Sequence, residues 1–201
     1  METGYFLTTQ RLGFRCWTED DLPLAMGLWG DPEVTALMGG PFAPEAVEAR
    51  LKREIARFME HGVQYWPIFL LDDGRHAGCA GLQPYCEEAG VYELGYHLRR
   101  DAWGGGLAKE AAQAVIDYAF GPLGIESLFA GHHPLNGASR KVLLSLGFVL
   151  AGEKLYPPSG MVEPAYRLKK NQDQRTWLYS EGVGVWTPIE STATKSSPVS
   201  S

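Results

Sequence analysis

The segment that most constrains the fold is a run of three glycines between an expected strand and an expected helix. Residues 91–98 read as a strand, Gly104 to Gly106 follow, and residues 107–120 carry the apolar spacing of a helix. The first amides of a helix have no partner within it and mark the positive end of its dipole. Glycines just before them let the backbone approach an anion closely, so the segment predicts a diphosphate cradle.

Two common phosphate loops do not fit this segment. A P-loop requires Gly-x-x-x-x-Gly-Lys-[Ser/Thr], which is absent here. The dinucleotide fingerprint Gly-x-Gly-x-x-Gly/Ala fails because Lys109 takes its last position counted from Gly104, and Leu107 its middle position counted from Gly105. A nucleotide-binding α/β protein is therefore disfavoured. A plain glycine-rich turn between strand and helix is the remaining alternative to a cradle.

The rest of the chain predicts a mixed sheet covered by helices. Strands are expected at 8–17, 64–71, 76–84, 91–98, 127–132, 148–155 and 164–170, and helices at 19–29, 44–61, 107–120 and 136–146. A meander of three strands followed by alternating helices and strands indicates a mixed α/β domain with helices on the faces of one sheet.

The end of the chain has a different character. Residues 191–201 contain seven Ser or Thr and one Pro, a composition typical of a disordered tail. Apolar residues between 177 and 186 either dock on the domain or mediate self-association. We therefore expect one domain over residues 8–170 and a partly disordered extension over residues 171–201.

Composition excludes several classes of protein. The net charge of -6 disfavours a dedicated nucleic-acid binder, which normally carries a basic surplus. The three cysteines form no CxxC pair, so we expect neither a disulfide framework nor a structural metal site. The first residues do not read as a secretory signal, and the apolar runs are too short to span a bilayer. We expect a cytoplasmic protein with no membrane contact.

A second strand–loop–helix segment narrows the range of possible functions. Asn136 stands where it can cap the helix that ends at Gly147, and Ser139 lies one turn further on. Together with the pattern x-x-Gly-x-Ala that ends at Ala108, this order resembles the GCN5-related N-acetyltransferase (GNAT) superfamily. The run from Gln10 to Asp21 is similar to the branch with the ribosomal-protein N-acetyltransferases of the Rim type. The resemblance covers residues 8–170.

The resemblance implies a fold and a co-substrate. The family has a central, mostly antiparallel sheet of about seven strands with helices on both faces, in which the strands matching 91–98 and 127–132 are parallel and splay apart. Acetyl-CoA would lie in this wedge. The residues implied in its binding are Tyr96, His97, Leu98, Trp103, Gly104, Gly105, Gly106, Leu107, Ala108, Asn136, Ser139 and Arg140. The family usually has Gln or Arg in place of Trp103, a small departure because backbone amides make most of the contacts.

The implied reaction is direct attack of an amine on the thioester. An amine is largely protonated near pH 7, so a base must accept a proton. Glu93 lies in an apolar strand beside the wedge, where desolvation would raise its pKa as suits a base; pairing with an arginine is the structural alternative. His132 or His133 is the competing base. Ser139 and Tyr156 are the candidates that protonate or stabilise the departing thiolate.

The acceptor remains open to several interpretations. It is either a protein N-terminus or a small-molecule amine, and we expect its pocket to be lined by Trp29, Met38, Phe42 and Tyr85. Residues 1–98 hold 7 basic and 15 acidic residues, which favours a cationic acceptor. The alternative function is a non-catalytic acyl-CoA-binding or interaction module on the same fold. We expect a monomer or homodimer.

Overall fold

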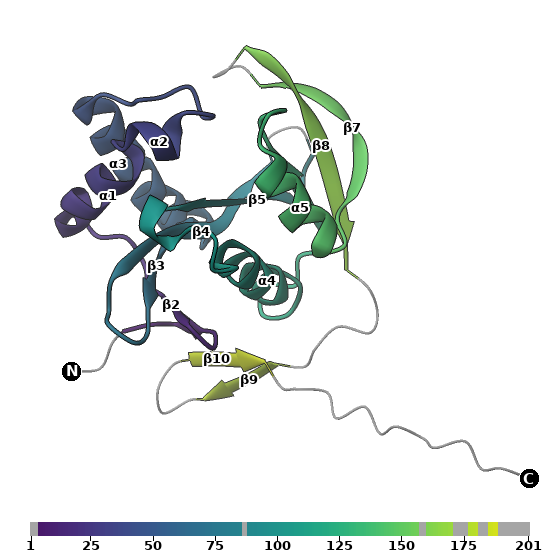
Figure 1. Cartoon of the computed structure of the whole chain (residues 1–201). Helices are drawn as coiled ribbons and strands as arrows, with labels where there is room; N and C mark the ends of the chain where they lie inside the picture. Colours follow the sequence, from purple (N-terminus) through teal and green to yellow (C-terminus); the bar gives the residue numbers. More distant parts are fainter. Residues whose placement is uncertain (1–3, 86–87, 157–159, 171–176, 181–184, 189–201) are drawn as a thin grey trace, which may run out of the picture.

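One sheet of ten strands organises the part of the chain that the computed structural model describes, residues 4–85, 88–156, 160–170, 177–180 and 185–188 (Figure 1). The strands are β1 (Leu7–Thr8), β2 (Leu12–Phe14), β3 (Tyr65–Leu70), β4 (His76–Pro84), β5 (Val91–Leu98), β6 (Ser127–Gly131), β7 (Val149–Tyr156), β8 (Met161–Lys169), β9 (Trp177–Ser180) and β10 (Val185–Pro188). The helices are α1 (Leu22–Trp29), α2 (Pro32–Thr35), α3 (Pro44–His61), α4 (Leu107–Phe120) and α5 (Gly137–Ser145), with short 3-10 turns at Glu19–Asp21 and Arg100–Ala102.

The sheet is mostly antiparallel, as the family resemblance implies. Its order is β7-β8-β6-β5-β4-β3-β2-β1-β10-β9, and within the described residues only β5–β6 and β1–β10 are parallel neighbours. The single strand expected at 8–17 is instead a tight hairpin of β1 and β2. The Thr9 N–H donates to the Leu12 carbonyl at 2.8 Å, and the Thr9 hydroxyl accepts from the Leu12 N–H at 2.9 Å.

The parallel strands β5 and β6 separate soon after they begin. They pair at Val91–Ser127, Tyr92–Leu128 and Glu93–Phe129, and at no later position of β5. On its other side β5 stays paired with β4 as far as Leu98. The edge of β5 after Glu93 therefore faces a gap, because β6 has turned away from it.

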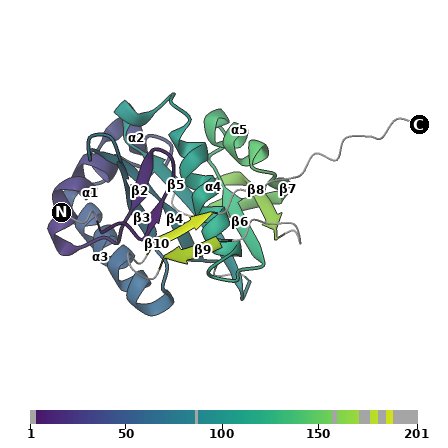
Figure 2. The same ribbon diagram turned by 90° about the horizontal axis from the view of Figure 1, so that it is seen from below.

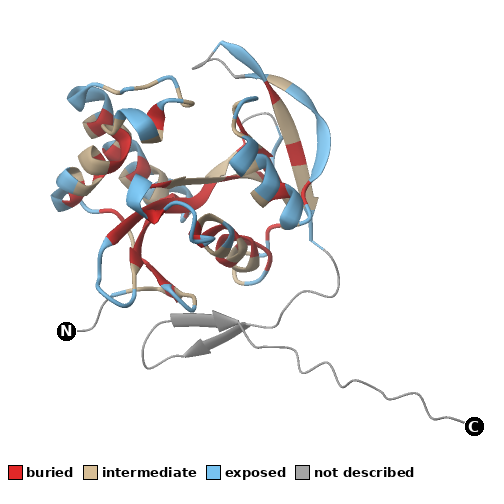
Figure 3. Ribbon diagram, in the orientation of Figure 1, coloured by how far each residue is buried: buried red, intermediate tan, exposed pale blue. Residues whose placement is uncertain are grey.

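Helices cover both faces of the sheet. Because side chains alternate along a strand, neighbouring residues pack against helices on opposite faces. On β3, Tyr65 packs with Trp29 and Leu51 of the α1–α3 layer, whereas Trp66 packs with α4. Figure 2 shows α1 and α3 apart from α4, with the central strands between them. Figure 3 shows the buried residues concentrated in those strands and on the inner side of α4.

Part of the segment beyond residue 170 adds to the sheet. Strand β10 pairs in parallel with β1, with Leu7 opposite Trp186, and β9 pairs with β10 in antiparallel fashion. The Ser/Thr-rich residues 191–201 lie outside the described residues. No described helix has the length and apolar character needed to cross a membrane.

We predict that Gly81→Ala destabilises the fold. A Cβ at this position would overlap the Gln64 carbonyl oxygen and lie 2.8 Å from the Tyr65 Cα, and both atoms belong to the paired backbone of the neighbouring strand. We expect the free energy of unfolding in urea to fall by about 1–3 kcal/mol. The matched control is Gly137→Ala, where an added Cβ meets nothing within 4 Å, and stability should change by less than about 1 kcal/mol. Equal losses in both variants would contradict this account.

Candidate functional site

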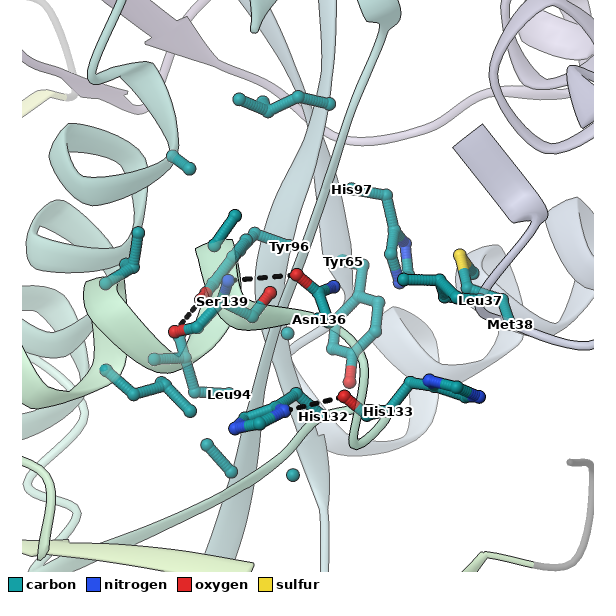
Figure 4. Close-up of a pocket in the computed structure, with 18 of the residues that line it drawn as sticks. Leu37, Met38, Tyr65, Leu94, Tyr96, His97, His132, His133, Asn136 and Ser139 are labelled. Carbon is teal, nitrogen blue, oxygen red and sulfur yellow. Dashed lines mark hydrogen bonds between the residues drawn. The ribbon is translucent and has the colours of Figure 1, made fainter. Parts of the chain in front are cut away.

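A cleft of about 770 Å³ opens where β5 and β6 separate. Its walls come from β5, β6, the loop before α4, the start of α5, α2 with the residues after it, one face of α3, and the β7–β8 pair. Figure 4 shows Tyr96, Asn136 and Ser139 grouped on one side and His97 and Met38 on the other. The fold thus brings segments that are far apart in the sequence to one cavity.

The glycine loop forms one end of this cleft and has the shape of an anion cradle. Gly104 and Gly106 have φ of +81° and +76°, a region that side chains disfavour. A Cβ added at Gly104 would meet no protein atom within 4 Å, and one at Gly106 only the Arg11 side chain at 3.8 Å. The first α4 amide to bond within the helix is that of Glu110, to the Gly106 carbonyl at 3.1 Å. The amides of residues 107–109 therefore have no partner in the helix, and the open space before them fits a pyrophosphate.

The β1–β2 turn holds the glycine loop in place. Arg11 donates through Nη1 to the Gly105 carbonyl at 2.8 Å and through Nε to Glu110 Oε2 at 2.6 Å. The Thr9 hydroxyl donates to the other Glu110 oxygen at 2.6 Å. Partial burial is the largest single influence on the pKa of Glu110, and it raises this pKa. The hydrogen bonds from Thr9 and Arg11 together outweigh burial, so the pKa of Glu110 lies below its ordinary value. This anchor is absent from the sequence predictions, because it joins residues about a hundred positions apart.

Tyr96 and Ser139 lie together on the α5 side of the cleft. Asn136 caps α5 by accepting from the Ser139 N–H at 3.0 Å, as predicted. The Tyr96 hydroxyl donates to the Ser139 carbonyl at 3.4 Å. Burial raises the pKa of Tyr96 to about 12, opposed by its hydrogen bond to Ser139. Tyr96 therefore holds its proton at neutral pH and is a hydrogen-bond donor in the cleft wall.

Glu93 lies at the point where β5 leaves β6, on the sheet face covered by α1 and α3. Its Oε2 accepts from Gln83 Nε2 at 2.8 Å. Burial is the main cause that raises the pKa of Glu93, and the nearby Glu163 carboxylate adds to the rise. Gln83, Lys154 and Arg57 oppose it. A half-buried carboxylate with a raised pKa suits proton transfer near neutral pH.

His132 lines the cleft but is poorly placed to act as a base. Its Nδ1 lies 2.8 Å from the His133 carbonyl, so Nδ1 carries the proton. Its Nε2 then accepts from the Tyr166 hydroxyl at 3.4 Å, and the two rings stack. Both nitrogens of His132 are thus engaged within the protein. His133 also lines the cleft, and its Nδ1 accepts from the Leu135 N–H at 3.2 Å.

Most of the residues predicted to bind acetyl-CoA line this one cleft. They are Tyr96, His97, Leu98, Trp103, Gly104, Gly106, Leu107, Ala108, Asn136 and Ser139. Gly105 and Arg140 do not line it: the Gly105 carbonyl faces Arg11, and Arg140 is exposed on α5. Trp103 keeps an exposed ring, and its Nε1 donates to the Leu98 carbonyl at 2.9 Å.

The predicted aromatic acceptor pocket needs correction. Met38 lines the cleft, but Trp29, Phe42 and Tyr85 do not. Trp29 is fully buried between α1 and the sheet, and Phe42 packs against the same layer. Tyr85 is buried and stacks on Phe129 at 4.3 Å, so it supports a cleft residue from behind. The side chain of Tyr156 lies outside the described residues.

Three further cleft residues escape the sequence analysis. Tyr65 reads as a core position of a strand, yet its ring crosses the sheet over Gly95, where an added Cβ would overlap it. Glu163 is buried beside Gly131, and the sequence gives no sign that this carboxylate is buried. Arg50 lies on α3, a helix for which the sequence predicts only an apolar buried stripe. All three carry polar groups that can act in the cleft, and nothing in their local pattern sets them apart.

The family follows from comparison with known proteins. Residues 11–149 match the model of the acetyltransferase (GNAT) domain. The chain therefore belongs to the GNAT acetyltransferase family. It is 33% identical over 154 residues to the uncharacterized N-acetyltransferase p20 of Bacillus licheniformis, across 76% of this chain and 85% of that protein.

Solved GNAT structures share this architecture. An acetyltransferase of the GNAT family from Bacillus anthracis superposes with a TM-score of 0.71 at 22% identity, covering 82% of this chain and 98% of that one. The ribosomal L7/L12 alpha-N-protein acetyltransferase RimL, solved in complex with coenzyme A, gives a TM-score of 0.70 at 18% identity over 84% of this chain and 99% of that one. At these identities the likeness shows the fold alone. The GNAT family uses acetyl-CoA, and the glycine cradle of this chain fits its pyrophosphate.

No group of three or more His, Cys, Asp or Glu within the described segments could hold a metal ion. Cys16 and Cys79 are free thiols, whereas Cys86 lies outside the described residues. Burial raises the pKa of Cys79 to about 12, which leaves it a neutral thiol. A nucleophilic cysteine needs a lowered pKa instead.

We predict that Gly106→Ala weakens coenzyme A binding by at least about tenfold, equivalent to about 1.4 kcal/mol. The new methyl group would enter the space in front of the first α4 amides. Gly124→Ala is the matched control: Gly124 also has a positive φ, of +65°, with nothing within 4 Å of an added Cβ, but lies outside the cleft. Calorimetric titration of both folded variants separates loss of the cradle from backbone strain. Equal affinities would refute the assignment.

Proposed function

We propose that this GNAT-family protein is an N-acetyltransferase that transfers the acetyl group of acetyl-CoA to the amine of a small molecule or a protein N-terminus. The observation that carries the proposal is that one cleft holds an anion cradle at one end and the half-buried carboxylate of Glu93 on another wall. A module that only binds an acyl-CoA requires the cradle but has no need of a carboxylate with a raised pKa.

The chain's own residues hold the two partners in the cleft. The amides of residues 107–109 bind the pyrophosphate of acetyl-CoA. The β5 edge after Glu93, which has lost β6 as a neighbour, offers backbone donors and acceptors to the amide groups of the pantetheine arm. When bound, acetyl-CoA supplies the thioester from which an amine takes the acetyl group.

Glu93 accepts the proton that the amine must lose. A carboxylate with an ordinary pKa is a weak base for an amine, and the raised pKa of Glu93 reduces this mismatch. The hydrogen bond from Gln83 and the nearby positive charge of Lys154 oppose this rise and favour the ionised form that accepts the proton. Glu93 is reached from the face on which α1 and α3 lie, so the amine enters from that side, directly or through a water molecule.

Ser139 and Tyr96 act on the side of the leaving sulfur. Both lie at the α5 wall of the cleft, and the Tyr96 hydroxyl is held by its bond to the Ser139 carbonyl. The Tyr96 hydroxyl has a single proton, which its raised pKa of about 12 retains at neutral pH. To hydrogen-bond the sulfur, this proton turns away from the Ser139 carbonyl, to which its bond is long at 3.4 Å. A hydroxyl is a weak acid, so hydrogen bonding to the departing thiolate is its main contribution. The sequence offers Ser139 and Tyr156 as the groups that stabilise the departing thiolate, and the structure adds Tyr96 to these candidates.

A thiol-release assay tests the proposal directly. The full-length protein is mixed with acetyl-CoA and a panel of amino acids, amino sugars, polyamines and short peptides, and acetylated products are identified by mass. We expect release of free coenzyme A that depends on one class of amine. Tight binding of acetyl-CoA without turnover of any amine would favour the alternative, a non-catalytic acyl-CoA-binding module.

We predict that Glu93→Gln lowers kcat/KM by at least about a hundredfold and removes the acid limb of its pH profile. In the wild type this limb should have an apparent pKa above the ordinary value of 4.5, because burial favours the protonated form. The control is Glu126→Gln, whose exposed carboxylate lies outside the cleft and whose activity should be unchanged.

The stability of the same variant separates catalysis from structure. The pKa of Glu93 is higher folded than unfolded, so its ionisation works against folding, and stability is lost as the pH rises through that pKa. Glutamine removes this cost and can still accept from Gln83. The Tm of the variant at pH 7 should therefore equal or exceed that of the wild type. A large fall in Tm, or activity with an unchanged profile, would assign Glu93 a structural role.

A further inference from the structure

The wall of the cleft formed by α3 carries an arginine that no described carboxylate neutralises. Arg50 lines the cleft, and its Nε is buried without a hydrogen-bond partner. Within the residues that the structure describes, its guanidinium has no ion pair. Taking a guanidinium partly out of water is costly unless a partner compensates for it. The described part of the chain supplies neither a carboxylate nor a hydrogen-bond acceptor for Nε in that role.

The acids closest along this wall are already paired. Glu54, one turn after Arg50 on α3, binds Arg57 at 2.5 Å and accepts from the Tyr65 N–H at 2.9 Å. Glu33 of α2 is paired with Arg100. Arg53, which shares the cleft-facing side of α3 with Arg50, also has no ion pair among the described residues. This wall therefore keeps an excess of positive charge.

Arg50 is held in a defined place. Its Cζ lies 4.5 Å from the centre of the Trp29 ring, a cation–π contact with a fully buried side chain. Trp29 is fixed in turn, because its Nε1 donates to His97 Nδ1 at 3.4 Å. A guanidinium supported in this way offers its donors to the cleft at little cost in conformational freedom.

Arg50 and Glu93 lie on the same face of the sheet with Tyr65 between them. The phenol of Tyr65 crosses β5 over Gly95, two residues after Glu93. Its pKa responds to both groups: the charge of Glu93 raises it and that of Arg50 lowers it, while burial is the main cause of its rise. Both groups line the same cleft, so an acceptor whose amine is placed at Glu93 can extend another group toward Arg50.

We propose that Arg50, assisted by Arg53, binds an anionic oxygen group, a carboxylate or a phosphate, that the acceptor carries beside its amine. This inference rests on the proposed function, since it names the class of acceptor for the same cleft. It also replaces the cationic acceptor expected from the charge of residues 1–98. That sum includes Glu33 and Glu54, which are paired, and exposed acids far from the cleft.

Matched pairs of acceptors test the proposal. Glycine and glycinamide differ by a carboxylate, and phosphoethanolamine and ethanolamine by a phosphate; putrescine serves as the cationic acceptor. We expect the wild type to favour the anionic member of at least one pair by about tenfold or more in kcat/KM, a difference of about 1.4 kcal/mol. The pair that shows the preference tells a carboxylate from a phosphate.

Arg50→Gln should abolish this preference by raising KM for the anionic acceptor. The KM for the neutral acceptor and the affinity for coenzyme A should stay within about twofold of the wild type. Misfolding would impair both, so these two measurements separate it from loss of the anion site. Arg50→Lys should retain part of the preference, because it keeps the charge but not the fork of donors. The control on the same helix is Lys52→Gln, whose exposed ammonium binds Glu48 outside the cleft.

Three results would overturn the proposal. They are a wild type that treats both members of each pair alike, a wild type that prefers putrescine, and an Arg50→Gln variant that loses both members equally. If no amine is acetylated at all, the proposed function fails, and thermal shift of the protein with coenzyme A still tests Arg50. Stabilisation by glycine or phosphoethanolamine that Arg50→Gln removes supports the anion site; no stabilisation of the wild type refutes it.

Discussion

The short pairing of β5 with β6 is the constraint on which the rest of the site depends. Three residue pairs hold these parallel strands together, and beyond Glu93 they separate. Because β5 remains fully paired with β4, the separation leaves it ordered while freeing one edge. The same event places Glu93 where the two strands part and brings the starts of α4 and α5, which follow the two strands, to the wall of the cleft. A longer ladder between β5 and β6 would close the cavity.

Local patterns predicted the parts of the molecule whose role is local. The glycine loop was recognisable because helix amides and left-handed glycines have a short-range signature, and Asn136 because a cap acts within three residues. The order of strands and helices also followed from periodicity. Trp29 shows where this reasoning fails: an aromatic residue beside an expected pocket is equally well explained as core, and the structure buries it beneath Arg50.

Residues that act across long sequence separations could not be found in this way. Arg11 reaches Gly105 and Glu110 only because the β1–β2 turn lies against the start of α4 in the folded protein. Glu163 comes near Glu93 from β8, the second strand after the last helix. For Arg50, sequence periodicity places the residue on α3 but cannot tell which of the neighbouring acids will already be paired. In each case the role of the residue depends on which group it contacts, and only the tertiary structure determines that contact.

The C-terminal hairpin has a consequence for the cofactor end of the cleft. Strand β10 lies along β1, and β1 leads directly into the turn from which Thr9 and Arg11 grip the glycine loop. A two-residue strand with one neighbour frays easily, whereas a strand flanked on both sides does not. By restraining β1, the β9–β10 hairpin also restrains the β1–β2 turn that holds the glycine loop. Part of the entropy cost of ordering this loop is therefore met during folding rather than when the ligand binds.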